Sequence, residues 1–188
     1  MNLETLCLHA GQAPDNDTLS RGVPIYRTSA FVFKDTDHAA NLFALKELGN
    51  IYTRLTNPTT AVLESRVAQL EGAHPAAGLA LASGTSAIFY AIINLAQAGD
   101  NIVAARNVYG GSYSMFDSIL PALGVEVRLV DSNDPENFVK ATDDKTRAFF
   151  CETVSNPACE VADLEAIANL AHDNGVPLIV DATFSTPY

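Results

Sequence analysis

The second half of this sequence alternates between short apolar runs and longer amphipathic runs, and this alternation constrains the fold more than any other feature. The apolar runs lie at 78–82, 102–105, 125–130, 147–151 and 176–181. Runs with helical periodicity separate them at 86–97, 112–120, 135–141 and 164–173, the last with Asp163 as its cap. Strands separated by helices at this spacing form mostly parallel sheets that are covered on both faces. The pattern therefore predicts an α/β fold built on a mostly parallel sheet with helices on both faces.

The first 57 residues lack this alternation. They carry Pro14, Pro24 and scattered polar residues, a composition that is typical of an extended arm rather than a layer of a sheet. Such an arm has few ways to bury its apolar residues except against a neighbouring domain or subunit. We therefore expect residues 1–57 to form an N-terminal arm and helix that make intersubunit contacts, and residues 58–188 to form the first part of an α/β domain.

Two helices are expected before the alternating region. The first begins at a cap formed by Asp35 or Thr36, and the second begins near Pro58, a residue suited to a first helical turn. Their apolar positions are Leu42, Phe43 and Leu45 in the first helix and Val62, Leu63, Val67 and Leu70 in the second. We expect the second helix to bury its four apolar side chains.

Composition excludes several classes of function. A net charge of −11 argues against nucleic acid or an anionic membrane surface as a partner. No apolar stretch approaches the roughly 18 residues that a membrane-spanning helix needs, and the N-terminus lacks the pattern of a secretory signal. The three cysteines (Cys7, Cys151 and Cys159) include no Cys-x-x-Cys pair, which favours a reducing cytoplasm, and the four histidines show no metal-binding spacing. We expect no metal site.

Polar side chains follow four of the predicted strands, at the points where those strands end. These segments are Ser83, Arg106–Tyr109, Glu152–Asn156 and Asp181. Ligands of open parallel sheets bind at the carboxyl ends of the strands. The four segments therefore predict one binding site at that edge of the sheet.

The segment Ser83–Ser86 opens a helix directly after a predicted strand. Backbone N–H groups and the helix dipole can hold a phosphate at such a turn, and Gly84 permits a close approach. An ordinary capped turn is the alternative interpretation. The sequence contains neither the Gly-x-Gly-x-x-Gly pattern of dinucleotide-binding folds nor the Gly-x-x-x-x-Gly-Lys phosphate loop.

Five further side chains each allow a functional and a structural interpretation. Asp181 either caps a turn or pairs with a cation such as a pyridinium N–H, which keeps the ring an electron sink. Tyr109 either packs or stacks on a flat cofactor. Tyr52 and Arg54 form either a solvated surface pair or a phosphate site, and Asn156 either belongs to a turn or donates a hydrogen bond to a phenolic oxygen.

These segments occur in an order that resembles the trans-sulfuration (Cys/Met metabolism) family of fold-type I enzymes, which depend on pyridoxal 5'-phosphate (PLP). The matching segments are Asn50–Arg54, Asn57–Thr59, Ala82–Ala87, Val108–Gly111, Glu152–Pro157 and Val180–Pro187. The resemblance covers essentially the whole chain. It implies an aspartate-aminotransferase-like large PLP domain, here incomplete.

The resemblance also implies roles for individual residues. The cofactor phosphate would be bound at Ser83, Gly84 and Thr85, mainly by the backbone of the last two. Tyr52 and Arg54 would reach the phosphate of a neighbouring subunit's cofactor. The remaining contacts would be Tyr109 stacked on the ring, Thr183 on its other face, Asn156 at the phenolic oxygen and Asp181 at the ring nitrogen. Tyr109 and Asp181 would serve in catalysis.

Four more selective segments resemble the branch of the family that acts on O-acetylhomoserine. They are Val23–Tyr26, Phe33–Ala40, Leu42–Lys46 and Gly110–Tyr113. This implies a transferase of methionine biosynthesis that replaces acetate with sulfide to give homocysteine, working as a cytoplasmic homotetramer of active dimers. The alternatives are an activity of the cystathionine γ-synthase or γ-lyase type, a non-catalytic N-terminal fragment, and one chain of a complemented enzyme. A nicotinamide-dependent dehydrogenase is disfavoured because the glycine fingerprint is missing.

The sequence departs from the family pattern in two places. Ala182 stands where many relatives have asparagine, and we expect little effect because that side chain need not face the ring. The lysine that holds the cofactor as a Schiff base follows the aspartate in the family, whereas the lysines here are Lys34, Lys46, Lys140 and Lys145. We therefore expect these 188 residues alone to be inactive.

Overall fold

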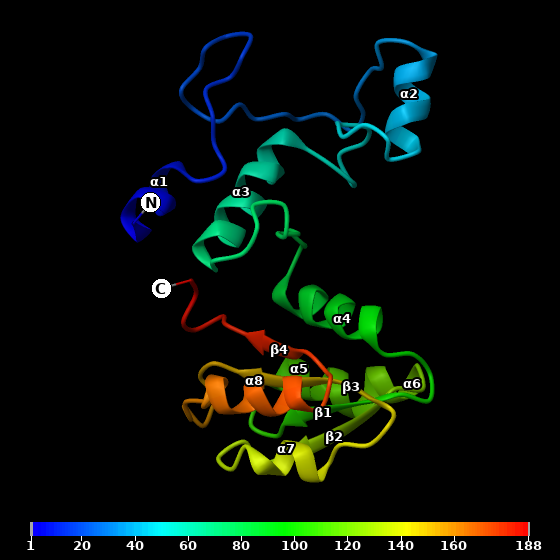
Figure 1. Cartoon of the computed structure of the whole chain (residues 1–188), viewed down its shortest axis with the longest axis vertical. Helices are drawn as coiled ribbons and strands as arrows, with labels where there is room; N and C mark the ends of the chain where they lie inside the picture. The colour runs from blue at the N-terminus through cyan, green and yellow to red at the C-terminus, as the bar shows by residue number, and fades with distance from the viewer. Residues whose placement is uncertain (1, 188) are drawn as a thin grey trace. The chain divides into compact units, whose positions relative to one another are not determined.

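The computed structural model describes residues 2–187 and consists of two compact units (Figure 1). The first unit ends at Ala80 and the second spans Leu81–Thr186. The helices of the first unit are α1 (Leu3–His9), α2 (Thr36–Phe43) and α3 (Pro58–Leu70). The first unit therefore extends past residue 57, where the predicted arm ends, and includes α3.

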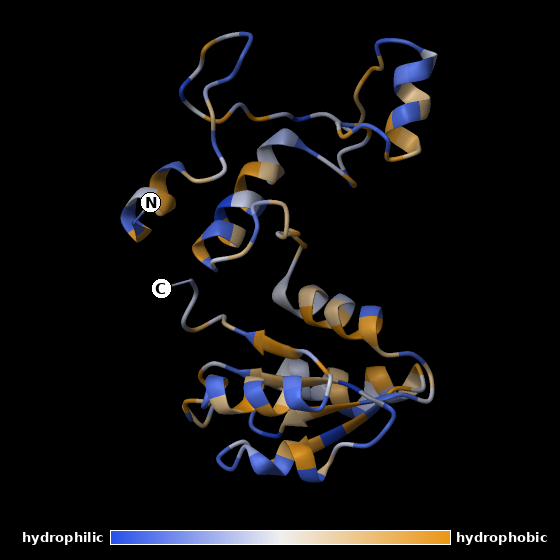
Figure 2. Ribbon diagram, viewed as in Figure 1, coloured by the Kyte–Doolittle hydropathy of each residue, from blue (hydrophilic) through white to orange (hydrophobic). Residues whose placement is uncertain are grey.

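The second unit is built on a parallel sheet, as the alternation predicts. Its strands are β1 (Asn101–Ala105), β2 (Glu126–Val130), β3 (Thr146–Glu152) and β4 (Leu178–Asp181). They lie in the order β2-β1-β3-β4, and every neighbouring pair is parallel. Figure 2 shows apolar residues along these strands. Because all four run the same way, their carboxyl ends share one edge, where Glu152 of β3 is in register with Asp181 of β4.

The helices of the second unit follow the predicted positions closely. They are α4 (Gly84–Leu95), α5 (Gly110–Ser114), a π-helical turn η1 (Met115–Ile119), α6 (Leu120–Ala122), α7 (Glu136–Lys140) and α8 (Leu164–Asp173). Asp163 caps α8 as predicted, since its Oδ1 accepts a hydrogen bond from the Ala166 N–H at 3.0 Å. The predicted helix at 112–120 begins two residues earlier and runs through α5, η1 and α6 without a break.

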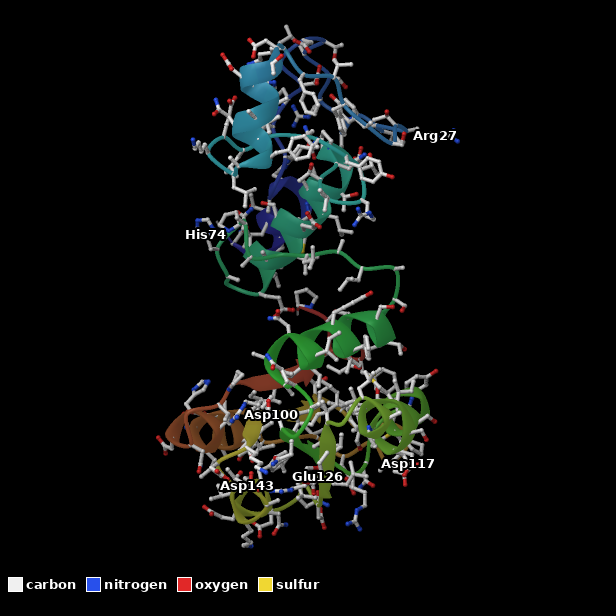
Figure 3. All side chains as sticks on the ribbon, turned by 90° about the vertical axis from the view of Figure 1, so that its right-hand side faces the viewer. Arg27, His74, Asp100, Asp117, Glu126 and Asp143 are labelled. Atoms are coloured by element: carbon white, nitrogen blue, oxygen red, sulfur yellow. The ribbon has the colours of Figure 1, made fainter. Side chains whose placement is uncertain are left out.

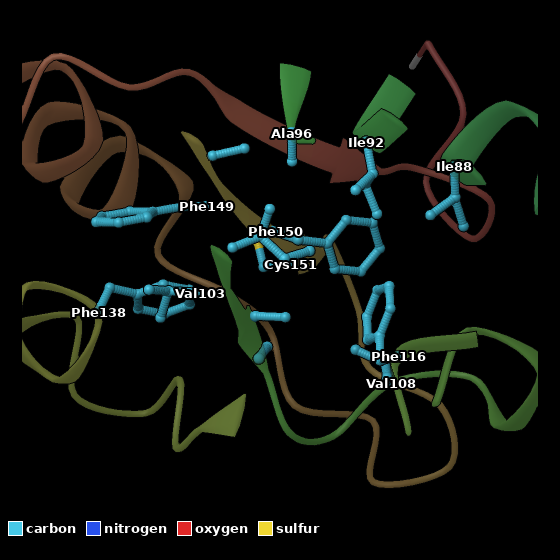
Figure 4. Close-up of a cluster of buried hydrophobic side chains, with 14 of the residues drawn as sticks. Ile88, Ile92, Ala96, Val103, Val108, Phe116, Phe138, Phe149, Phe150 and Cys151 are labelled. Carbon is cyan, nitrogen blue, oxygen red and sulfur yellow. The ribbon is translucent and has the colours of Figure 1, made fainter. Parts of the chain in front are cut away.

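Successive residues of β3 point to opposite faces of the sheet. Both faces therefore carry apolar side chains, and a helix packs against each of them. Phe149 packs against Phe138 of α7, with ring centres 5.3 Å apart. Phe150 points to the other face and packs edge-on against Phe116 of η1 at 5.1 Å (Figure 4). All four rings are buried. Cys151 lies among them, and burial raises the pKa of its thiol to about 12.

A charged cluster lies at the amino ends of the strands, opposite the edge that carries Glu152 and Asp181 (Figure 3). Asp143 Oδ2 accepts a hydrogen bond from the Arg128 guanidinium at 2.7 Å, and Asp143 Oδ1 accepts one from the Asn101 amide at 2.8 Å. These bonds join β1, β2 and the loop before β3. Arg147 forms an ion pair with Asp100 at 2.8 Å beside them.

The predicted strand at 78–82 is wrong. Residues 78–82 lie outside any strand, because no described strand lies alongside to complete a hydrogen-bonded ladder. This segment lies against α3 instead at two points. The Ala80 N–H donates to Glu64 Oε1 at 2.9 Å, and a side chain at Gly78 would overlap the Glu64 backbone.

The predicted burial of α3 is also wrong in part. Leu63 and Val67 are 56% and 41% exposed, whereas Val62 and Leu70 are half-buried. The physical reason is that the first unit offers little apolar surface to this helix. α1 does pack against α3, and the Arg66 guanidinium donates to the Ala10 carbonyl at 2.9 Å. The sequence pattern did not predict the helix α1.

The helix α2 begins at the predicted cap and ends before the last predicted apolar position. Asp35 Oδ1 accepts a hydrogen bond from the His38 N–H at 2.7 Å. Leu42 is buried, whereas Phe43 is exposed and Leu45 lies beyond the end of the helix. One apolar side chain therefore anchors this helix within its own unit.

Candidate functional site

A cavity of about 350 Å³ opens at the carboxyl edge of the sheet. Its walls come from the start of α4, the loop before α5, the segment after β3 and the segment after β4. The lining residues are Gly84, Thr85, Ile88, Tyr109, Ser112, Glu152, Val154, Asn156, Asp181, Thr183 and Phe184. The cavity therefore lies where ligands of parallel sheets bind.

The start of α4 presents free backbone donors to this cavity. The Ser83 hydroxyl is occupied in capping the helix: its Oγ accepts from the Ser86 N–H at 3.1 Å and is paired with Ser86 Oγ at 3.0 Å. Among the described residues, no acceptor pairs with the N–H groups of Gly84 and Thr85. A Cβ at Gly84 would meet open space. This turn is thus a capped turn and also a pair of N–H groups suited to an anion.

Asp181 ends β4 with one oxygen engaged. Its Oδ1 accepts hydrogen bonds from both the N–H and the hydroxyl of Thr183, at 2.9 Å and 2.5 Å. Its Oδ2 has no hydrogen-bond donor among the residues that the structure describes. The Thr183 contacts fix the carboxylate in one orientation and leave an acceptor free for a ligand donor.

Tyr109 stands at the entrance to α5 with half of its surface exposed. Its ring lies over Gly111, where a Cβ would come within 2.6 Å of the Tyr109 ring carbon Cε1. Gly111 therefore provides the space in which the ring lies. An exposed aromatic face at a cavity wall can stack on a planar ligand.

Glu152 lines the cavity in a role that was not predicted from the sequence. It ends β3 and is 6% exposed. Its Oε1 accepts the Tyr109 N–H at 2.7 Å, and its Oε2 accepts the Asn156 N–H at 3.0 Å. Burial raises the pKa of this carboxyl group, and the charge of Asp181 raises it further, while the two N–H donors oppose both effects. An acid that closes an apolar run, with a polar loop after it, was the signal in the sequence.

The structure brings six of the nine predicted site residues to this cavity. These are Gly84, Thr85, Tyr109, Asn156, Asp181 and Thr183. Ser83 adjoins them as the cap of α4. Tyr52 and Arg54 belong to the first unit, where the Arg54 guanidinium carbon lies 5.6 Å from the centre of the Tyr52 ring.

The cavity suits a flat cation that carries an anionic group. Two of its lining residues, Glu152 and Asp181, are acidic and none is basic. A protonated aromatic nitrogen would balance the two carboxylates and could donate to Asp181 Oδ2. A phosphate would find the N–H groups of Gly84 and Thr85. These residues therefore fit PLP, which combines both features.

Comparison with known proteins leads to the same cofactor. The family of Cys/Met metabolism PLP-dependent enzymes matches residues 4–188. The chain belongs to this family, and the expected α/β PLP-domain fold is confirmed.

Two curated relatives are especially similar. The chain is 55% identical over 185 residues to O-acetyl-L-homoserine sulfhydrylase of Leptospira meyeri, covering 98% of this chain and 41% of the relative. It is 56% identical over 185 residues to O-acetyl-L-homoserine sulfhydrylase 1 of Thermus thermophilus, covering 98% of this chain and 44% of the relative. The chain thus spans less than half the length of the curated relatives it matches.

A solved structure has nearly the same backbone. It is a putative O-acetylhomoserine (thiol)-lyase from Campylobacter jejuni, described with N'-pyridoxyl-lysine-5'-monophosphate. The TM-score is 0.94 at 42% identity, covering 100% of this chain and 45% of that one. Within residues 2–187 of the present chain, no group of three His, Cys, Asp or Glu side chains could hold a metal ion. No helix of this described part is long and apolar enough to cross a membrane.

Proposed function

We propose that these residues belong to a PLP-dependent transferase that replaces the acetate of O-acetylhomoserine with sulfide and yields homocysteine. The relatives that are named O-acetyl-L-homoserine sulfhydrylase support the substrate and the nucleophile. The observation that carries the proposal is the cavity in which a free oxygen of Asp181, two free N–H groups of α4 and the ring of Tyr109 converge. PLP, when bound, takes up electrons from the α-carbon of an amino-acid substrate.

In this proposal, Asp181 controls the electronic state of the cofactor ring. Its free Oδ2 accepts the N–H of the ring nitrogen and keeps that proton in place. Thr183 holds Oδ1 through two hydrogen bonds, so the carboxylate need not reorient when the ring arrives. A charge-assisted hydrogen bond of this kind contributes about 1.5–3 kcal/mol.

The other cavity residues orient the cofactor. The N–H groups of Gly84 and Thr85 hold the phosphate at the positive end of the α4 dipole, and Ser83 keeps the turn in shape. Tyr109 would cover one face of the ring, Thr183 would lie against the other, and Asn156 would donate to the phenolic oxygen. The apolar wall formed by Ile88, Val154 and Phe184 limits the access of water.

We also propose that residues 1–57 act across a subunit boundary, with residues 58–188 forming the first part of the PLP domain. Tyr52 and Arg54 would contact the phosphate bound by a neighbouring copy. The large exposed apolar side chains of the arm support this proposal, because a second copy could cover them. They include Ile25, Val32, Phe43 and Leu48. The assembly would be a homotetramer of active dimers.

The proposal is tested on the purified protein at its natural length. With O-acetylhomoserine and sulfide we expect homocysteine and acetate, together with the visible absorption of bound PLP. Asp181→Asn should lower the rate roughly 10- to 100-fold, since it replaces a charged acceptor by a neutral one. Asp173→Asn, at the exposed end of α8, is the control and should leave the rate unchanged.

Three results would contradict the proposal. The first is a protein without visible PLP absorption. The second is formation of a 2-oxo acid and ammonia instead of homocysteine, which would indicate elimination. The third is cysteine outcompeting sulfide to give cystathionine, which would indicate a synthase.

A further inference from the structure

Glu152 is a buried carboxylate beside a second carboxylate, an arrangement that is unfavourable for a side chain that only fills space. It is 6% exposed, lines the cavity and is in register with a second carboxylate, Asp181. Register partners on parallel strands point to the same face of the sheet, so the two acids face the same cavity. Burying a carboxylate beside another is unfavourable unless hydrogen bonds compensate.

The two oxygens of Glu152 each hold a different loop. Oε1 accepts the Tyr109 N–H and Oε2 accepts the Asn156 N–H, at 2.7 Å and 3.0 Å. One loop precedes α5, and the other follows β3. Tyr109 is the N-cap residue of α5, and within residues 2–187 its side chain makes no capping hydrogen bond to the first turn of that helix. A single side chain therefore sets the spacing between these two loops.

A carboxylate is the chemical group that this geometry requires. Both contacts need an acceptor, and only an ionised carboxylate offers a strong acceptor at each of two oxygens. A glutamine would accept one N–H and direct its own NH2 donor at the other. The requirement for two acceptors explains why a charged group occupies a buried position beside Asp181.

The spacing between the loops determines where two ligand contacts lie. The Tyr109 ring is held over Gly111, so its position follows that of the Tyr109 backbone. The Asn156 side chain is attached at Cα, which is bonded directly to the backbone nitrogen whose N–H Glu152 accepts. Both residues line the cavity. A shift of either backbone would change the gap available to a planar ligand.

We propose that Glu152 is a positioning residue that holds Tyr109 and Asn156 at the separation which the bound PLP ring needs. This inference rests on the proposed function, because Tyr109 and Asn156 must contact the cofactor for their spacing to matter. Glu152 itself needs no contact with the cofactor.

The experiment compares Glu152→Gln with Glu160→Gln in the protein at its natural length. Glu160 is the matched control, because it also follows β3 and binds the same loop, through the Asn107 side-chain amide at 2.7 Å, yet does not line the cavity. The apo forms are titrated with PLP, and visible circular dichroism reports how the bound ring is oriented. We expect Glu152→Gln to weaken PLP binding roughly tenfold, because a displaced Tyr109 or Asn156 would lose about one contact with the cofactor, and to change the dichroism signal. Glu160→Gln should match the parent.

A thermal melt of the apo protein separates positioning from folding. Glutamine removes a buried negative charge but directs an NH2 donor at one of the two N–H groups, so the apo melting temperature of each variant is measured and PLP affinity is compared well below the lower of the two. In a Tyr109→Ala background, Glu152→Gln should cost less PLP affinity than in the parent, because the ring it positions is gone.

Several outcomes would overturn the inference. One is parental PLP affinity and dichroism in Glu152→Gln, and another is strict additivity with Tyr109→Ala. A third is a lower apo melting temperature that accounts for the whole loss of affinity. Failure of the unsubstituted protein to bind PLP would instead refute the proposed function, so the two failures are distinguishable.

Discussion

At the scale of single residues, Glu152 and Asp181 show how environment divides the work of two acids. They are register partners on neighbouring strands, yet Glu152 uses both oxygens on protein N–H groups, whereas one oxygen of Asp181 has no donor among residues 2–187. The charge of Asp181 also raises the pKa of Glu152. A cationic ring in the cavity would offset this repulsion. A bound ligand of this kind should therefore reduce the free-energy cost of burying the ionised Glu152 side chain.

The neighbouring glycines of the Tyr109 loop allow a controlled test of ring position. Gly111→Ala places a Cβ within 2.6 Å of the Tyr109 ring, which must then move. We expect PLP affinity to fall roughly tenfold, in line with the usual cost of an added methyl group in a filled space. Gly110→Ala is the matched control, since its Cβ would meet no atom within 4 Å. Equal affinity of the two variants for PLP in a titration would show that the ring does not contact the cofactor.

At the scale of elements, the local chemistry of the sequence was enough to place those that carry their own signals. Asp163 and Asp35 predict their helix starts because a cap acts within one turn. The runs that form β1 to β4 are apolar enough to identify without knowing their neighbours. The segment 78–82 has the same composition but finds no ladder, since pairing depends on residues elsewhere.

The candidate site could likewise be predicted only where its residues carry a local signal in the sequence. Residues that follow strands, such as Asp181 and Tyr109, could be assigned to one edge because parallel strands share it. The role of Glu152 could not, because it depends on two N–H donors from loops far apart in the sequence. The exposure of Leu63 and Val67 was likewise unpredictable, since helical periodicity shows which side is apolar but not what covers it.

The opposite edge of the sheet supports a stability prediction. The pKa of Asp143 is lowered, first by its hydrogen bond from Asn101 and then by Arg128. A carboxylate whose pKa is lowered in the folded state stabilises the fold at pH values above the ordinary carboxyl pKa. This stabilisation is lost as the pH falls through the lowered pKa of the folded state. Asp143→Asn should therefore lower the melting temperature at neutral pH, because the charged acceptor for Asn101 and Arg128 is lost.

The pH series supplies the check on this assignment. The difference in melting temperature between Asp143→Asn and the parent should narrow once the pH drops below about 4, the ordinary carboxyl range. Asp144→Asn, at the next position and exposed, should melt like the parent at every pH. A difference in melting temperature that stays constant at every pH would show that the substitution acts through side-chain packing and not through the charge of Asp143.

At the scale of the whole molecule, the two compact units differ in how they satisfy their apolar residues. The second unit encloses an aromatic core on both faces of its sheet. The first unit leaves many large apolar side chains exposed, among them Val32 and Leu48 at 95% and 91%. This contrast is the basis for proposing that the arm completes its burial against another copy of the chain.

A complementation experiment at natural length tests that proposal. If Arg54 serves the cofactor of a neighbouring subunit, each site combines an arm from one copy with Asp181 of another. Arg54→Ala and Asp181→Ala, each inactive alone, should then form mixed dimers with one intact site of two, so that random mixing leaves about a quarter of all sites intact. Mixing Arg54→Ala with Tyr52→Ala is the control, because every site then receives a damaged arm. Activity no higher than in this control would show that the arm serves its own subunit.

The cap formed by Ser83 has a practical consequence for mutagenesis. The Ser83 hydroxyl is already bonded to Ser86, so the proposed phosphate site consists of backbone N–H groups. Every amino acid except proline has this group. If the backbone at position 85 binds the phosphate as proposed, a saturation screen at this position should show that most side chains are tolerated. Proline at position 84 is the informative exception: it deletes one N–H, the first turn of a helix accepts it, and the extended backbone of Ser83 already suits a following proline.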